Sequence, residues 1–268
     1  MNELIHDCQK NHKFQQREHR KFLALMLFIQ VTRFKCRGFI FGLATNHCMC
    51  DGLGAIGFVS SWGETAPGLP LCVTPSLDRS ILKARDHTKI EFPHHEFTKI
   101  ENVSDTTNLY QDKVRDKSCL DPEKLVQLKQ MALKDKALGK CTTFQALSAF
   151  VWRARCKALK LRPEQQNRLL FTVDGWPRLN PPLSKFFFGN GIVLMNSLCI
   201  ASELLDMPFS FTVVLVQKAV SMVTYSYIRS AVEYFEAKIY PPSLSSTLLI
   251  TTWSKLSLLL FFSPSYLL

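Results

Sequence analysis

A histidine and an aspartate four residues apart are the residues of this sequence best suited to chemistry. His47 and Asp51 lie in the stretch NHCMCDG, and Gly52 follows the aspartate directly. An apolar run with helical spacing comes next, so the pair is expected in a loop between a strand and a helix. Asp followed by Gly is also a common turn pair, which leaves a purely structural role open.

Two chemical roles are compatible with this spacing. An imidazole titrates near neutral pH, so His47 could accept a proton from an alcohol or amine as a general base, while Asp51 orders the loop. The neighbouring Cys48 and Cys50 raise the alternative of zinc, which needs four ligands or three and a water. No second cluster of cysteines and histidines at ligand spacing supplies the rest. We therefore expect no metal.

Composition narrows the class of protein. The chain has 268 residues, of which 47% are hydrophobic, enough for one large domain or two small ones. The net charge of +11 is scattered apart from the basic stretch 10–21, which is too short to predict nucleic-acid binding. Nine cysteines without a C-x-x-C pair indicate reduced thiols and a cytoplasmic protein. The apolar stretches near the two ends are short or interrupted, and we expect no stable membrane insertion.

Alternating strand and helix patterns predict an α/β fold. Strands are expected over 31–36, 38–46, 168–175, 191–201 and 246–256. The first two flank a turn at Arg37-Gly38, and the apolar run of 38–46 is typical of a strand covered on both faces. Four prolines and little periodicity over 67–97 predict a long crossover loop.

Helices are expected over 52–66, 121–137, 142–159 and 209–237. Asp121 has the position of an N-cap, and Thr142 and Gln145 have the spacing of a capping box. The apolar face of the third helix is expected to contain Leu147, Phe150, Val151 and Ala154.

Longer stretches resemble the plant BAHD acyltransferases, whose motif is H-x-x-x-D-G. The matching stretches follow the family's order across about residues 30–257 and include NHCMCDGLGAIGFVSSW, CTTFQALSAFVWRARCKALK, VDGWPRLNPPL, FFFGNGIVLMNSLC and LLITTWSKL. Members transfer an acyl group from a coenzyme A thioester to an alcohol or amine. Within the family, the chain is most similar to the transferases that place hydroxycinnamoyl (feruloyl) groups on ω-hydroxy fatty acids.

This resemblance implies an acyl-CoA-dependent O-acyltransferase. Its partners would be a hydroxycinnamoyl-CoA donor and an alcohol acceptor such as an ω-hydroxy fatty acid or fatty alcohol. The protein would be a monomer without a bound cofactor. His47 matches the catalytic base and Asp51 the structural aspartate. Gly52 and Thr251 match substrate-binding positions, and the indole of Trp253 is expected to hydrogen-bond the oxyanion.

The resemblance also implies two chloramphenicol-acetyltransferase-like domains with mixed sheets, incomplete in this chain. We expect a non-family basic leader over 1–29, a remnant of the N-terminal domain over 30–77, a crossover loop over 78–115, the C-terminal domain over 116–246, and a returning strand with an aberrant apolar tail over 247–268. The family's D-F-G-W-G motif does not follow the last strand. A catalytically inactive, truncated member that acts as an interaction partner is therefore the alternative hypothesis.

Two substitutions fall inside family motifs. Trp176 stands where the family has an arginine, which leaves Arg178 as the expected ion-pair partner of Asp51. Phe187 replaces the tyrosine that precedes Phe-Gly-Asn. We also expect the last strand to return towards 38–46, so that Trp253 approaches His47.

Overall fold

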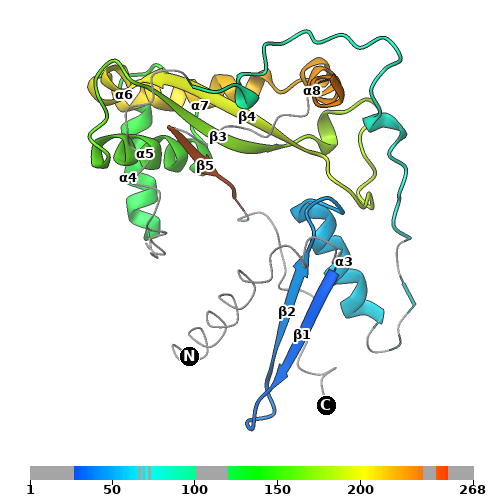
Figure 1. Ribbon diagram of the computed structural model, residues 1–268. Coiled ribbons are helices and arrows are strands. Elements are labelled where there is room, and N and C mark those ends of the chain that lie inside the picture. The colour runs from blue at the N-terminus through cyan, green and yellow to red at the C-terminus, as the bar shows by residue number, and fades with distance from the viewer. Residues whose placement is uncertain are drawn as a thin grey trace. The chain divides into compact units, whose positions relative to one another are not determined.

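A computed structural model describes residues 27–65, 68, 70–71, 74–100, 120–237 and 246–252 (Figure 1). Contacts group the chain into two compact units. Unit 1 comprises Met1–Asp78, Ser184–Asn190 and Leu256–Leu268, and unit 2 comprises Arg79–Leu183 and Gly191–Lys255. The segment Ser184–Asn190, which we placed within 116–246, thus clusters with unit 1. The basic stretch 10–21 lies outside the described residues.

The described part of unit 1 contains a hairpin and a helix. β1 (Leu27–Arg33) pairs antiparallel with β2 (Phe39–Thr45). Arg37 has a left-handed φ of 66° in the turn between them, where the turn was predicted. α3 (Gly52–Thr65) matches the predicted helix 52–66. Its Trp62 packs edge-on against Phe41 of β2, with ring centroids 5.1 Å apart.

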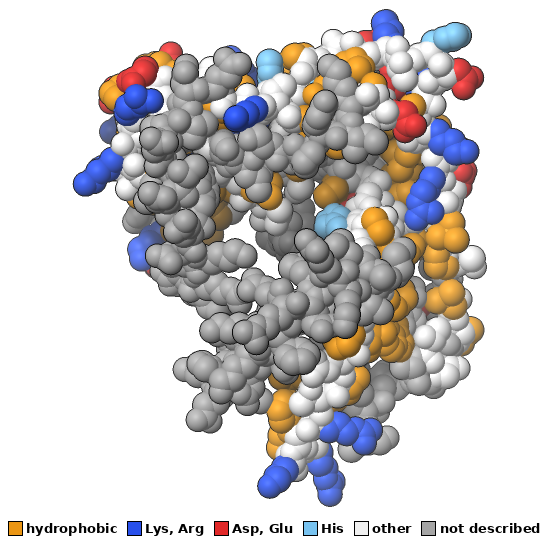
Figure 2. Space-filling view, in the orientation of Figure 1, with side chains coloured by type: hydrophobic (Ala, Val, Ile, Leu, Met, Phe, Trp, Pro, Cys, Tyr) orange, Lys and Arg blue, Asp and Glu red, His pale blue; other side chains and the backbone are white. Residues whose placement is uncertain are grey.

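The prediction that 38–46 is covered on both faces is wrong for the described residues. Within them, β2 pairs only with β1, and exposed apolar side chains occur on both strands. A strand is buried on both faces only where a layer packs on each side, and the Phe41–Trp62 contact covers one of them. Figure 2 shows Lys and Arg side chains at the turn end of this hairpin, where the exposed basic residues are Arg33, Lys35 and Arg37.

Unit 2 contains a mixed three-stranded sheet in the order β4-β3-β5. β3 (Gln166–Asp174) pairs antiparallel with β4 (Ile192–Ile200) and parallel with β5 (Thr247–Ile250). β3 is central and is buried continuously from Asn167 to Phe171, where the apolar run begins at Leu169. The predicted strands 168–175 and 191–201 are confirmed. The last predicted strand is β5, which pairs with β3. Trp253 lies outside the described residues, so its expected approach to His47 stays a prediction.

Local sequence signals correctly predicted where the first helices of unit 2 begin. α4 (Pro122–Leu133) starts at its N-cap Asp121, whose carboxylate accepts a hydrogen bond from the Lys124 backbone N–H at 2.8 Å. α5 (Thr143–Ala158) starts with both hydrogen bonds of the capping box between Thr142 and Gln145. Short-range hydrogen bonds satisfy helix-end donors whatever the tertiary fold, which is why these starts are readable from sequence.

The face that α5 buries differs from the predicted one. Phe150 and Val151 are exposed, at 44% and 37% of their surface. The buried positions of the helix are instead Gln145, Ala146, Ser148, Ala149, Trp152 and Cys156. Three small side chains on this face, Ala146, Ser148 and Ala149, let α5 pack closely on its neighbours. The fully buried Trp152 lies on the same face and donates its indole N–H to the Asn167 side chain at 3.1 Å. The buried face therefore combines small residues with one large aromatic residue, Trp152.

The predicted helix 209–237 is two helices, which follow the short α6 (Ala201–Asp206). α7 (Phe209–Met222) and α8 (Tyr225–Ala237) meet at a bend of 79°. Arg178 donates to the carbonyls of Val220 and Val223 at 2.9 and 2.7 Å. These hydrogen bonds supply partners for backbone carbonyls that the end of α7 leaves without one inside the helix. The Thr224 hydroxyl accepts the Tyr227 N–H at 3.3 Å and caps α8.

Among the described residues, no single helix is both long enough and apolar enough to cross a membrane. The bent pair α7 and α8 meets the length and composition criteria only when the two helices are counted together.

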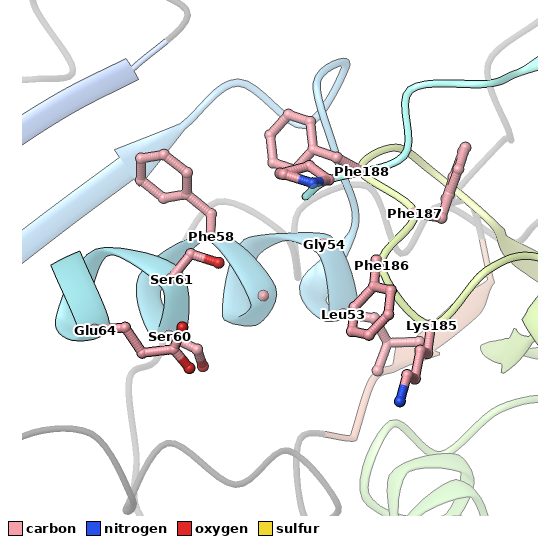
Figure 3. A pocket seen from close by; sticks show the side chains of 12 residues that line it. Leu53, Gly54, Phe58, Ser60, Ser61, Glu64, Lys185, Phe186, Phe187 and Phe188 are labelled. Carbon is pink, nitrogen blue, oxygen red and sulfur yellow. The ribbon is translucent and has the colours of Figure 1, made fainter. Parts of the chain in front are cut away.

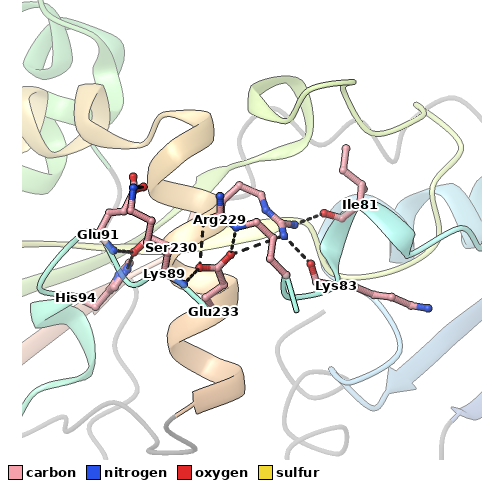
Figure 4. Close-up of polar contacts among 9 residues, drawn as sticks. Ile81, Lys83, Lys89, Glu91, His94, Arg229, Ser230 and Glu233 are labelled. Carbon is pink, nitrogen blue, oxygen red and sulfur yellow. Dashed lines mark hydrogen bonds and ion pairs between the residues drawn. The ribbon is translucent and has the colours of Figure 1, made fainter. Parts of the chain in front are cut away.

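The described part of the crossover, 79–100, is irregular apart from the 3-10 turns η1 (Ser80–Leu82) and η2 (His95–Phe97), as predicted. Polar side chains of α8 hold it (Figure 4). The buried Glu233 carboxylate accepts from the Arg85 guanidinium at 2.5 and 3.1 Å and from the Lys89 N–H at 2.6 Å. Arg229 donates to the backbone carbonyls of Ile81 and Lys83. These side chains supply the partners that a strand neighbour would give to a regular segment.

We predict that Glu233→Gln destabilises unit 2 in a pH-dependent way. The hydrogen bond from Arg85 lowers the pKa of Glu233 below the usual 4.5. Its stabilisation is therefore complete above that pH and is lost as the pH falls through the lowered pKa. At neutral pH the variant should lose about 1–3 kcal/mol of unfolding free energy, because buried partners are left poorly satisfied. The difference from wild type should shrink as the pH falls below the usual value.

Urea denaturation followed by circular dichroism at several pH values measures this loss. The matched control is Glu236→Gln, because Glu236 lies on the same helix and is exposed. Equal effects of the two substitutions at neutral pH would contradict the role of Glu233.

Candidate active site

The loop between β2 and α3 exposes His47 and buries Asp51. Its turn is closed by the Met49 N–H, which donates to the Asn46 carbonyl at 3.0 Å. The Asn46 side chain accepts from the Cys48 N–H at 3.1 Å. His47 is exposed, whereas only 1% of the Asp51 surface is accessible. The imidazole is thus available to a ligand and the carboxylate is built into the fold.

Asp51 caps α3. Its Oδ1 accepts hydrogen bonds from the backbone N–H groups of Leu53 and Gly54, both at 3.0 Å. A carboxylate at this position also interacts favourably with the positive end of the helix dipole. The expected ion pair of Asp51 with Arg178 would join residues of different units and stays a prediction.

Cys50 is a packing residue. Burial, together with the charge of Asp51, raises the pKa of its thiol, so the thiol stays protonated and is a poor nucleophile. In the described part of the chain, no group of three or more His, Cys, Asp or Glu side chains is arranged to hold a metal ion.

A segment distant in sequence holds the His47 loop. The Asp51 N–H donates to the Gly189 carbonyl at 3.1 Å. The Asn190 side-chain amide contacts His47 twice, with Nδ2 donating to the His47 carbonyl at 2.7 Å and Oδ1 lying 3.1 Å from Nδ1 of the ring. Asn190 ends the Phe-Phe-Gly-Asn motif, and no role was predicted for it from the sequence. Its only signal was a polar side chain after a glycine within a family motif.

The contact between this segment and α3 leaves no room for a side chain at Gly54. A Cβ atom there would lie 2.8 Å from the Cys50 Cβ and 3.3 Å from the Gly189 carbonyl oxygen. The first distance is shorter than carbon atoms tolerate without movement. Gly54 is therefore required by the close approach of two backbones.

A cavity of about 260 Å³ lies along α3 and the segment 185–188 (Figure 3). Its walls are largely apolar, and Glu64 and Lys185 are the charged residues among them. The lining residues are Leu53, Gly54, Gly57, Phe58, Ser60, Ser61, Glu64, Pro75, Lys185, Phe186, Phe187 and Phe188. Phe187, which replaces the tyrosine of the family motif, is buried here. The segment that holds His47 thus also forms one wall of this cavity.

A second histidine, His94 of unit 2, has the contacts of a hydrolytic triad. Its Nε2 lies 2.8 Å from Ser230 Oγ and its Nδ1 lies 2.7 Å from Glu96 Oε1. Glu96 also accepts from the Tyr227 hydroxyl at 2.5 Å and from the Asn196 amide at 3.0 Å. Burial and the Glu96 carboxylate raise the pKa of Tyr227, so its hydroxyl stays protonated and donates.

Burial and hydrogen bonding exclude a reaction at this triad. His94, Glu96 and Ser230 are each at most 1% exposed. The Ser230 oxygen accepts the backbone N–H groups of Glu91 and Phe92, which occupies both of its lone pairs. A serine without a free lone pair cannot attack a substrate, so this cluster fixes the crossover to α8.

The structure brings together three of the predicted site residues. His47 and Asp51 share one loop, and Gly52 is the first residue of α3. Thr251 is exposed just after β5, in unit 2, and its relation to His47 stays a prediction. Trp253 lies outside the described residues, so its oxyanion role also stays a prediction.

Residues 8–258 match the Transferase family. The chain belongs to this family, the BAHD acyltransferases. The match covers both units and the H-x-x-x-D-G motif at His47. It begins within the stretch 1–29 that we expected to lie outside the resemblance.

Two curated relatives from Arabidopsis thaliana are similar over 85% of this chain. The chain is 54% identical to omega-hydroxypalmitate O-feruloyl transferase over 232 residues, which are 51% of that protein. It is 51% identical to fatty alcohol:caffeoyl-CoA acyltransferase over 231 residues, which are 53% of that protein. The chain therefore spans about half the length of these relatives.

Solved structures share the fold. F. graminearum TRI101 complexed with coenzyme A and deoxynivalenol matches with a TM-score of 0.68 and 17% identity, over 87% of this chain and 56% of that one. Vinorine synthase matches with a TM-score of 0.58 and 19% identity, over 85% of this chain and 51% of that one. The predicted α/β class with chloramphenicol-acetyltransferase-like mixed sheets is confirmed.

We predict opposite effects for alanine at two glycines of α3. Gly57→Ala adds a methyl group where no atom lies within 4 Å, so better helix propensity should stabilise the protein by about 0.5–1 kcal/mol. Gly54→Ala should destabilise it by about 1–3 kcal/mol, because the methyl group displaces the Cys50 side chain or the Gly189 backbone. Urea denaturation of both variants tests this difference. A Gly54→Ala variant as stable as Gly57→Ala would refute the close approach.

Proposed function

We propose that this protein transfers a hydroxycinnamoyl group from its coenzyme A thioester to the hydroxyl of an ω-hydroxy fatty acid or a fatty alcohol. The two relatives described above support the choice of substrates, because each exceeds 50% identity over most of this chain. The wider family supports the reaction class, acyl transfer.

The observation that carries the proposal is the exposure of His47 beside a buried Asp51. Among the described residues, Asn190 alone hydrogen-bonds the His47 ring, so the imidazole has a nitrogen available for a substrate hydroxyl. The Asp51 carboxylate caps α3, whereas the hydrogen-bond partner of the His47 ring is Asn190. The loop therefore supports a single general base with a structural aspartate.

The proposed reaction is a direct transfer. His47 takes the proton of the acceptor hydroxyl while the hydroxyl oxygen attacks the thioester carbonyl. A tetrahedral intermediate forms. Collapse of the intermediate breaks the carbon–sulfur bond, and the imidazolium returns the proton to the coenzyme A thiolate. No acyl-enzyme is required, because the raised pKa of the buried Cys50 makes it a poor nucleophile.

The remaining features of the proposal follow from this chemistry. Acyl-CoA is a co-substrate, and general-base transfer needs no bound cofactor. We also propose a cytoplasmic protein, because an odd number of cysteines without a C-x-x-C pair favours reduced thiols. We propose a monomer on the family resemblance alone.

We predict that His47→Ala lowers the rate of transfer by about 10²–10⁴-fold, the usual contribution of a positioned general base. The assay measures the ester formed from feruloyl-CoA and a long-chain ω-hydroxy acid, with a fatty alcohol as second acceptor. Cys48→Ser is the matched control from the same exposed loop and should keep most of the activity.

Full activity of His47→Ala would refute the mechanism. A folded wild-type chain that transfers no acyl group to either acceptor would refute the proposed enzyme and favour the inactive family member instead. Circular dichroism of each sample separates these results from a failure to fold.

A further inference from the structure

We propose that Asn190 is a positioning residue that holds the proton of neutral His47 on Nδ1 and leaves Nε2 as the proton acceptor. The catalytic part of this inference rests on the proposed function, whereas the position of the proton does not. Two contacts of one amide carry it. Asn190 Nδ2 lies 2.7 Å from the His47 carbonyl oxygen, and Asn190 Oδ1 lies 3.1 Å from His47 Nδ1.

The first contact fixes the orientation of the amide. A backbone carbonyl oxygen can only accept a hydrogen bond, so the NH₂ end of the Asn190 side chain must face it. The opposite orientation would place two acceptor oxygens at 2.7 Å without a proton between them. The Asn190 oxygen therefore faces the imidazole ring.

The orientation of the amide then fixes the ring. The Asn190 oxygen can only accept, so its contact with Nδ1 is a hydrogen bond only when Nδ1 carries the proton. A neutral imidazole has one N–H, and Nε2 is consequently left with its lone pair. A histidine side chain free in water exchanges between both forms, whereas this contact favours one of them.

The backbone on both sides of the contact is held. Gly189, next to Asn190, accepts the Asp51 N–H at 3.1 Å. Further back, Ser76 exchanges hydrogen bonds with Phe186 and Phe188, both at 2.8 Å. These backbone hydrogen bonds hold the segment in place, so the Asn190 side chain acts on the ring from a fixed position.

This arrangement suits a base that must be regenerated. When Nε2 takes the proton of the hydroxyl, the Nδ1–H bond to Asn190 is kept, so the ring need not turn. Asn190 is neutral, so it orients the ring without a full negative charge that would hold the imidazolium. A carboxylate in its place would stabilise the cation more strongly and slow the return of the proton.

The position of the proton can be observed directly in the full chain with nitrogen-labelled histidine. A proton–nitrogen correlation spectrum of the imidazole rings distinguishes the two neutral forms, and loss of a signal in His47→Gln assigns it to His47. We expect the Nδ1–H form in wild type and a mixture of both forms in Asn190→Ala.

Lys185→Ala is the matched control, because Lys185 is exposed on the same segment and is not among the contacts of the His47 ring. Its spectrum should equal that of wild type. An Nε2–H form in wild type, or the same form in wild type and folded Asn190→Ala, would overturn the inference.

The kinetic experiment uses the transfer assay over a range of pH. Asn190→Ala should lower kcat about tenfold, the effect of one lost hydrogen bond, with KM little changed. Asn190→Asp should move the acidic limb of the kcat profile to higher pH, because its carboxylate favours the imidazolium. The added charge moves this limb whatever the role of Asn190, so the deciding kinetic result is that of Asn190→Ala. Unchanged kcat in the folded Asn190→Ala variant would reject the positioning role.

The two experiments separate the inference from the proposed function. An Nδ1–H signal from a wild-type chain without transfer would reject the enzyme and keep the inference about the proton. Transfer by wild type with an Nε2–H signal would keep the enzyme and reject the role of Asn190.

Discussion

The hydrogen bonds between the Gly189–Asn190 segment and the His47 loop are the constraint on which the site depends. His47 and Asn190 are 143 positions apart in the sequence, so the contact closes a long loop at an entropic cost. The Asp51 N–H and the His47 carbonyl both use this segment as their partner. Because both ends of the loop are held, His47 stays exposed while Asp51 is buried. Gly54 permits the backbone approach that brings these partners within reach.

The same physical device recurs in unit 2, where distant side chains satisfy backbone groups that regular structure leaves open. Arg178 caps the C-terminus of α7 by donating hydrogen bonds to two backbone carbonyls. Arg229 donates hydrogen bonds to two backbone carbonyls of the irregular crossover. Glu233 accepts hydrogen bonds from the backbone of the crossover and from the side chain of Arg85. A long connection with little secondary structure can be ordered in this way, since each buried polar group has a partner.

The sequence predicted what short-range interactions determine. Asp121 and the Thr142–Gln145 capping box marked helix starts, because their partners lie within three residues. The break between α7 and α8 was missed because a side chain from another element, Arg178, helps to end an apolar pattern without Gly or Pro. The buried face of α5 was missed because the predicted face left out Trp152, which is fully buried and donates a hydrogen bond to Asn167 of β3. The role of Asn190 was missed because its partner, His47, is close only in the folded chain.

His47 and His94 show that hydrogen-bond geometry alone does not define a catalytic base. In both rings Nδ1 faces an acceptor oxygen, from Asn190 in one case and Glu96 in the other. The difference lies at Nε2. That of His94 accepts the hydroxyl of a buried Ser230, whose oxygen is already saturated by backbone donors. That of His47 belongs to an exposed ring, where an incoming hydroxyl can become its partner. A fixed ring with an accessible lone pair is what general-base transfer requires, and of these two histidines His47 has both.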